Sequence, residues 1–306
     1  MAEAGFYTHP SAARVTNQWE RGGLSWTELG TRVWHEVQKD GLLGRAAQLA
    51  YYFLLALFPL LLFFTALIGL FPINAPTSAL LEYARQVIPS EAFGLVERYL
   101  DNVVHGSGTD VLSLGIIGAL WASSSGMTAI MEALNVAYDT AETRPFWKVR
   151  LLGILLTLCL TGLIILSATL VVYGGFVLDW ATHFFALTLV SELTWRLVRW
   201  PLAIGLMLVA MAIIYYACPD VEQPWRWVTP GAVFAVLMWL LVSLAFKYYV
   251  QHFGNYNVAY GSIGGVIVLM LWLYLSGAVI LLGGQINAEI EAAARQQSLP
   301  DSTLRS

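Results

Sequence analysis

The chain has 306 residues, of which 58% are hydrophobic and only 12% are charged, and its 16 basic and 20 acidic side chains give a formal net charge of −4. A soluble domain carries roughly 25% charged residues, so this chain has too few charges to cover a water-exposed surface. The composition excludes a soluble globular domain, a disordered chain and a basic nucleic-acid-binding domain. Together with the mean hydropathy of +0.66, it indicates an integral membrane protein.

Residues 1–45 form a polar N-terminal segment that precedes the first apolar run. Within it, Trp26, Leu29, Val33 and Val37 recur at the spacing of one helix face, with polar and charged residues between them. This pattern predicts an amphipathic helix at the membrane interface. Two roles are open for it: a collar that packs against the bundle, or a sensor of lipid.

Residues 46–289 are predicted to form the transmembrane domain. Runs of about 20 apolar residues with few charges predict membrane-spanning helices, and the chain has six: Ala46–Phe71, Val111–Met131, Leu151–Leu178, Pro201–Cys218, Val228–Phe246 and Ser262–Gln285. No ionisable residue stands at the middle of any run, which argues against a proton relay or a voltage sensor built from buried charge. The predicted fold class is all-α, a polytopic membrane helix bundle with six transmembrane helices.

Three segments outside these runs have patterns of their own. The first external loop, residues 72–110, is expected to form a helical cap from two short helices separated at Pro89. Asp179–Arg199 is patchily apolar but carries charges, so we expect an amphipathic segment at the interface, with a seventh span as the alternative. Residues 290–306 are expected to be a disordered tail.

The distribution of basic residues predicts the orientation in the membrane. Six spans place both termini on one side, and 11 of the 16 Lys and Arg residues fall on that side. Because short cytoplasmic loops are enriched in Lys and Arg, both termini are expected to be cytoplasmic.

Residues that could support catalysis are scattered. The five histidines lie in separate regions and at no metal-ligand spacing: His9, His35, His105, His183 and His252. No HExxH, GxSxG or GxxxxGK[ST] motif occurs. The sequence therefore predicts no enzyme, no catalytic residue, no metal site, no cofactor and no nucleic-acid partner.

A few polar side chains near the ends of the apolar runs are the candidate binding residues. Gln48, Asn135, Gln285 and Asn287 are predicted either to line the polar mouth of a substrate cavity or to form hydrogen-bonded contacts between helices. Pro59 interrupts the first run, and Gly261 and Gly264 stand at the entry to the sixth. We expect these three residues to act as hinges.

Several motifs, taken together, resemble the YihY/BrkB family of bacterial inner-membrane proteins, once mislabelled as ribonuclease BN. They are AYYFLLALFPLLL (Ala50–Leu62), LWASSSGMTAIMEALNVAY (Leu120–Tyr138), RPFWKVR (Arg144–Arg150), YYACPD (Tyr215–Asp220), TPGAVFAVLMW (Thr229–Trp239), YGSIGGVIVLMLWLYLSG (Tyr260–Gly277) and GGQINAE (Gly283–Glu289). The resemblance implies six spans, cytoplasmic termini and a location in the bacterial inner membrane. The family commonly has a carboxylate where this chain has Gln285, so the resemblance does not imply a proton-coupled role at that position.

These observations favour a transporter or exporter of a lipid-like or amphipathic substrate, with membrane lipids as its partners. The alternative is a membrane structural or assembly factor that transports nothing, in which the same polar residues only hold helices together. Ribonuclease activity is not expected. The spacing of Gly118 and Ala122 permits close packing in a homo-oligomer.

Overall fold

The computed structural model describes residues 23–70, 109–172, 192–223, 229–253 and 262–298, and the structural statements below concern these ranges. Within them every regular element is an α-helix, which confirms the predicted all-α fold class. The helices are α1 (Trp26–Lys39), α2 (Leu42–Leu70), α5 (Thr109–Ala137), α6 (Phe146–Val172), α8 (Glu192–Ala217), α9 (Pro230–Phe253) and α11 (Ser262–Ser298).

Helix α1 is the amphipathic helix predicted from the spacing of its apolar residues. Its start is fixed by a capping box, in which Ser25 Oγ accepts from the Glu28 amide at 3.2 Å and a Glu28 carboxylate oxygen accepts from the Ser25 amide at 2.8 Å. Leu29 and Val37 are buried, and α1 packs against α11 and α2. The described part of the chain therefore shows α1 as a collar on the bundle.

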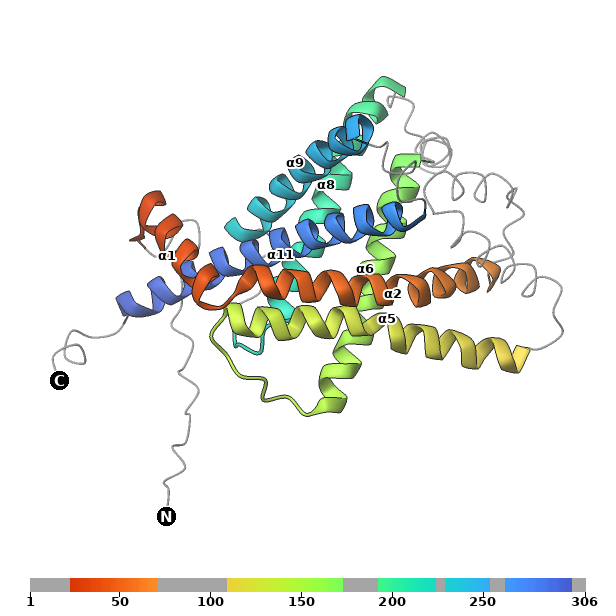
Figure 1. Ribbon diagram of the computed structural model, residues 1–306, viewed down its shortest axis with the longest axis horizontal. Coiled ribbons are helices and arrows are strands. Elements are labelled where there is room, and N and C mark those ends of the chain that lie inside the picture. The colour runs from red at the N-terminus through yellow and green to blue at the C-terminus, as the bar shows by residue number, and fades with distance from the viewer. Residues whose placement is uncertain (1–22, 71–108, 173–191, 224–228, 254–261, 299–306) are drawn as a thin grey trace, which may run out of the picture.

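Helices α2, α5 and α11 form the centre of the structure. They lie side by side in Figure 1, and α1 contacts the C-terminal part of α11 at one end of the molecule. Their facing sides supply much of one buried cluster that includes Leu49, Met131, Leu134 and Leu281. The first and last helices are therefore neighbours in space.

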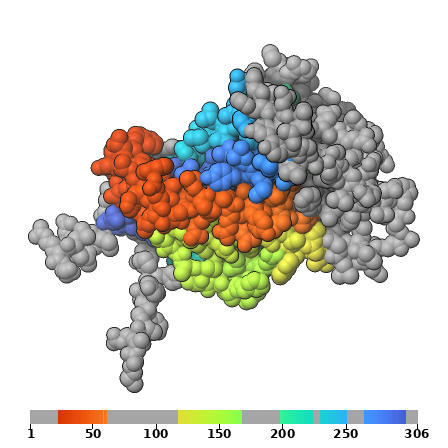
Figure 2. Space-filling view, viewed as in Figure 1, coloured from red at the N-terminus to blue at the C-terminus, as the bar shows by residue number. Residues whose placement is uncertain are grey.

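Helices α6, α8 and α9 complete the bundle: α6 packs on α5, α8 on α6 and α9, and α9 on α11. Along α9, Leu237, Leu241 and Leu244 are 60–67% exposed, whereas Ala232 and Ala235 are fully buried. Small residues inside and large apolar residues outside are what a helix needs when its outer face meets lipid. Figure 2 shows α2, α5, α9 and α11 together on one face of the molecule.

The six predicted spans correspond to six long helices. Four helical segments are long and apolar enough to cross a membrane, within α6, α8, α9 and α11: Phe146–Ser167, Val198–Ala217, Pro230–Val250 and Gly264–Gln296. Helices α2 and α5 have 29 residues each, and at 1.5 Å per residue either exceeds the roughly 30 Å hydrocarbon core. The chain is thus a polytopic helical membrane protein.

Two predicted boundaries differ from the structure. Helix α8 begins at Glu192, so the end of the expected interfacial segment Asp179–Arg199 is continuous with the fourth span. Helix α11 continues through Ser298, so the expected disordered tail, residues 290–306, begins as helix, and the packing of α1 against α11 accounts for this. The expected external cap, residues 72–110, lies outside the described residues.

Helices α9 and α11 approach each other most closely at two glycines. A Cβ placed on Gly231 would overlap the backbone carbonyl of Gly283 and lie 2.6 Å from Oδ1 of Asn287, and one placed on Gly283 would lie 2.7 Å from the carbonyl oxygen of Gly231. Backbone atoms cannot move aside as a flexible side chain can. The crossing therefore requires glycine at both positions.

We predict that Gly231→Ala lowers the free energy of unfolding by roughly 2 kcal/mol or more, because the added methyl group forces the two helices apart. Thermal unfolding of the purified protein in detergent measures the effect. Gly205→Ala on α8 is the matched control, since nothing lies within 4 Å of the added methyl group, and it should be neutral or stabilising by up to about 1 kcal/mol. Equal stability of both variants would contradict the close crossing.

Candidate functional site

A group of polar residues lies where α5 ends. The last turn of α5 closes with two backbone hydrogen bonds, from the Thr140 amide to the Asn135 carbonyl at 2.8 Å and from the Asp139 amide to the Val136 carbonyl at 2.9 Å. This pair of bonds forms a Schellman motif. Asp139 occupies its left-handed position with φ of 48°, where glycine is the usual residue, so the turn holds a carboxylate in a strained conformation.

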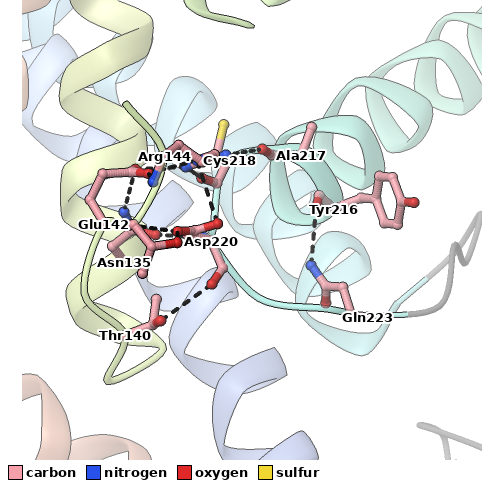
Figure 3. Close-up of polar contacts among 10 residues, drawn as sticks. Asn135, Thr140, Glu142, Arg144, Tyr216, Ala217, Cys218, Asp220 and Gln223 are labelled. Carbon is pink, nitrogen blue, oxygen red and sulfur yellow. Dashed lines mark hydrogen bonds and ion pairs between the residues drawn. The ribbon is translucent and has the colours of Figure 1, made fainter. Parts of the chain in front are cut away.

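Arg144 joins the chain after α5 to the end of α8. It forms a two-pronged ion pair with Glu142, in which Nε donates to Oε1 and Nη2 to Oε2, each at 2.7 Å. The same guanidinium donates to the carbonyls of Ala217 at 3.3 Å and Cys218 at 2.9 Å. A cation at these carbonyls also neutralises the negative end of the α8 dipole. Figure 3 shows Arg144 between the two segments.

Asn135 and Asp220 complete this network, which we call the Arg144 cluster (Asn135, Glu142, Thr143, Arg144 and Asp220). The buried Asn135 amide donates to Glu142 at 2.9 Å and accepts from the Asp220 amide at 2.7 Å. The Asp220 carboxylate accepts from the backbone amide and the hydroxyl of Thr143 at 2.7 and 2.6 Å. Asn135, a predicted substrate-binding residue, is therefore engaged in contacts between α5 and α8.

Asn287 holds the start of α9 against α11. Its Oδ1 accepts from the Gly231 amide at 2.9 Å, and its Nδ2 donates to the Thr229 hydroxyl at 3.0 Å. The Thr229 hydroxyl also accepts from the Ala232 amide at 3.1 Å, as an N-cap side chain does. Pro230 is the first residue of the helix. Two amide groups at the start of α9, which have no partner within the helix, are satisfied in this way.

The other predicted site residues lie apart from one another. Gln48 is exposed on α2, whereas Gln285 is 2% exposed on α11, and its Oε1 has no hydrogen-bond partner among the described residues. Pro59 lies inside α2, and Gly264 is buried in the first turn of α11. Gly261 lies outside the described residues. The structure thus brings Asn135, Gln285 and Asn287 to one end of the bundle but does not bring Gln48 among them.

A cavity of about 330 Å³ adjoins this polar end, between the end of α5, the residue after Asp220 and the last turns of α11. Its polar lining consists of Tyr138, Asp139, Glu289, Glu291 and Arg295. Glu291 is 6% exposed; its Oε1 accepts from Arg295 at 3.4 Å, and its Oε2 has no partner among the described residues. Lys39, the last residue of α1, lies 3.9 Å from the Asp139 carboxylate at the rim.

The chemistry open to this cavity follows from its lining. Three carboxylates and one guanidinium favour polar groups with hydrogen-bond donors or positive charge. Over the described ranges, no group of three His, Cys, Asp or Glu side chains is arranged to hold a metal ion. The cavity has the size and polarity of a binding site for the polar part of a small molecule.

The sequence did not single out the cavity, and of the Arg144 cluster it singled out only Asn135. Three of the cluster's charged residues lie in loops, where charged side chains are usually solvated: Glu142, Arg144 and Asp220. Glu291, in the cavity wall, lies in the predicted tail. One sequence signal pointed to this cluster: Arg144 lies in the RPFWKVR motif and Asp220 in the YYACPD motif. The two residues are 76 positions apart in the sequence and form an ion pair, with Arg144 Nε 3.6 Å from Asp220 Oδ1. A pairing of this range depends on helix packing and not on local pattern.

Comparisons with known proteins agree with the membrane fold. The family model described as Virulence factor BrkB matches residues 33–304. The Putative ribonuclease-like protein YfkH of Bacillus subtilis (strain 168) is 40% identical over 258 residues, which cover 84% of this chain and 92% of that protein. The UPF0761 membrane protein xcc-b100_3490 of Xanthomonas campestris pv. campestris (strain B100) is 26% identical over 92% of this chain and 66% of its own length. No solved structure matches.

The ion pair with Arg144 predicts how stability depends on pH. The hydrogen bonds from Arg144 hold the pKa of Glu142 below its ordinary value of 4.5. A carboxylate with a lowered pKa in the folded state stabilises that state above its unfolded pKa, and this contribution is lost as the pH falls through the folded pKa. The melting temperature of the protein should therefore fall on acidification below about pH 4.5, and less steeply in Glu142→Gln.

Melting curves at a series of pH values measure this difference. Glu222→Gln, at an exposed position outside the Arg144 cluster, serves as the control and should keep the wild-type slope. Identical slopes for Glu142→Gln and the wild type would show that the ion pair adds nothing to stability.

Proposed function

Because the chain belongs to the BrkB virulence-factor family of membrane proteins, we propose that it transports or exports a lipid-like or amphipathic substrate whose polar head enters the cavity at the ends of α5 and α11. The observation that carries the proposal is a cavity of about 330 Å³ with a buried, incompletely paired carboxylate, Glu291, in its wall. Leaving a buried carboxylate oxygen without a hydrogen bond is costly. Because Glu291 Oε2 has almost no exposed surface, a ligand that donates to it must displace neighbouring atoms of the cavity wall.

The roles of the amide side chains follow from their partners. Asn135 and Asn287 keep the walls of the cavity in place, since each bonds two elements together. Gln285 has a buried oxygen without a hydrogen-bond partner among the described residues, so we propose that it contacts the polar head. Pro59, Gly261 and Gly264 are proposed as the hinges that let α2 and α11 move during transport.

The proposed orientation places the cavity on the cytoplasmic side of a bacterial inner membrane. The packing of α1 against α11 is consistent with both termini lying on one side. The excess of basic residues on that side supports the cytoplasmic assignment. A substrate would then enter the cavity from the cytoplasm or from the inner leaflet.

The second candidate function is a structural or assembly factor. The Arg144 cluster and the Asn287 contacts favour it, because buried polar residues that bond only to other helices serve packing. The ribonuclease-like name belongs to the Bacillus relative. We propose no such activity here, because the candidate site has neither a metal-holding group of side chains nor a basic surface for a phosphate backbone.

Reconstitution into liposomes tests the transport proposal. Mass spectrometry of protein purified in native lipid should find an enriched amphipathic molecule, and the protein should move a fluorescent phosphatidylethanolamine or the enriched molecule between leaflets. Glu291→Gln should reduce the initial rate at least about tenfold, the size expected for one lost hydrogen bond to a buried charge. Glu132→Gln, at an exposed position on α5 outside the cavity, should leave the rate unchanged.

Two results would count against transport. The first is the absence of both an enriched molecule and any movement above protein-free liposomes, and it favours the assembly factor. The second is movement with equal rates in Glu291→Gln and the wild type, which would place the substrate path away from the cavity.

A further inference from the structure

The guanidinium of Arg150, a residue of α6, lies against the middle of helix α5. Arg150 lies near the start of α6. Its Nη2 donates to the Trp121 carbonyl. Ser125 Oγ accepts from Nη1 at 3.3 Å and from Nη2 at 3.4 Å. The Cζ of Arg150 also lies 4.2 Å from the centroid of the Trp121 ring. Trp121 and Ser125 stand halfway along α5 (Thr109–Ala137), at the centre of the second predicted span.

This placement changes what the sequence indicated. From the sequence, Arg150 marks the boundary of the third predicted span. No ionisable residue was expected near the centre of any span. Because α6 crosses α5 near its middle (Figure 1), the side chain contacts the middle of α5. Arg150 itself stands in the second turn of α6 (Phe146–Val172), near the end of that helix, where lipid phosphates lie. A charge held against a membrane helix is costly unless another group compensates it.

The described part of the chain offers Arg150 no acidic partner. Among the described residues its acceptors are one carbonyl and one hydroxyl, both neutral, and its Nε is buried without a hydrogen bond. A guanidinium stays protonated and has more N–H donors than two neutral acceptors fill. Some donors of the guanidinium are therefore left without a hydrogen bond among the described residues, and an anionic group would fill them.

The surface around Arg150 is apolar and open. Ile117, Trp121, Phe146 and Trp147 are each at least 50% exposed. In a membrane protein, large exposed apolar and aromatic side chains meet lipid. An anion that reaches Arg150 along this surface must carry hydrocarbon, which a free aqueous anion does not.

We propose that Arg150, together with Ser125 and Trp121, binds the phosphate group of a membrane phospholipid, whose acyl chains lie on the apolar surface of α5 and α6. The planar fork of arginine matches two phosphate oxygens, and basic pockets between membrane helices bind lipid head groups. This site is separate from the cavity at the ends of α5 and α11 and stands on different observations. The bound lipid supplies the counter-charge for Arg150 and holds α6 at its crossing with α5.

Lipid titration of the purified protein tests the site. The delipidated protein in detergent is titrated with phosphatidylglycerol, and native mass spectrometry gives the apparent dissociation constant of the tightest lipid. Arg150→Gln should raise this constant at least about tenfold, and Arg150→Lys, which keeps the charge but loses the fork, about threefold to tenfold. Lys148→Gln removes a neighbouring positive charge on the same helix and should leave the constant unchanged.

Two further measurements distinguish a lipid site from a site for a free anion and from no site at all. A large excess of inorganic phosphate should not displace the lipid; displacement would identify a free-anion site and overturn the lipid assignment. Unchanged affinity in both Arg150→Gln and Arg150→Lys would overturn the site itself. Should Arg150→Gln fail to fold, as judged by helical circular dichroism, Arg150→Lys decides the question, since wild-type affinity there rejects phosphate recognition by the fork.

Discussion

A polar group buried between membrane helices must find its hydrogen bonds within the protein, because lipid offers none. At the shared end of α5, α8, α9 and α11 this requirement is met almost completely. Arg144 satisfies the last carbonyls of α8 and the carboxylate of Glu142, Asn135 connects Glu142 to Asp220, and Asn287 satisfies the first amides of α9. The ends of α5 and α8 are held together, and the start of α9 is held to α11, by these side chains.

Against this background, the incompletely bonded groups are informative. Glu291 and Gln285 lie on consecutive turns of α11, and each keeps one buried oxygen without a partner among the described residues. Arg150 has donors that two neutral acceptors do not fill. Asp40 Oδ2, Arg199 Nε and Ser243 Oγ are likewise buried without a partner among the described residues. Of the first three residues, Glu291 lines the cavity and Arg150 lies at the crossing of α5 and α6. Both proposals rest on this contrast between satisfied and unsatisfied groups.

The helices could be predicted from local sequence patterns. The candidate site could not, because it is formed by the packing of helices that are distant in the sequence. The spacing of Leu29 and Val37 predicted α1, and uncharged length predicted the spans, because each feature is a property of neighbouring residues. The pairing of Arg144 with Asp220 and the reach of Arg150 to Trp121 depend on how distant helices cross. Asn135, Gln285 and Asn287 were singled out as polar residues near helix ends, but their partners, and the exposure of Gln48, follow only from the fold. The predicted roles of Pro59, Gly261 and Gly264 concern motion and stay predictions.

The proposed function requires the cavity between α5 and α11 to receive the polar part of an amphipathic molecule. Photo-crosslinking from within the cavity tests it most directly: a photoreactive amino acid replaces Ala292, an exposed residue of the cavity wall, and the adduct formed in native membranes is identified by mass spectrometry. We expect an adduct with one class of amphipathic molecule. It should be lost when Glu291→Gln is added, and it should differ from the mixed lipid adducts formed at Leu244 on the exposed side of α9. Adducts at position 292 that match those at position 244, or that persist unchanged with Glu291→Gln, would contradict it.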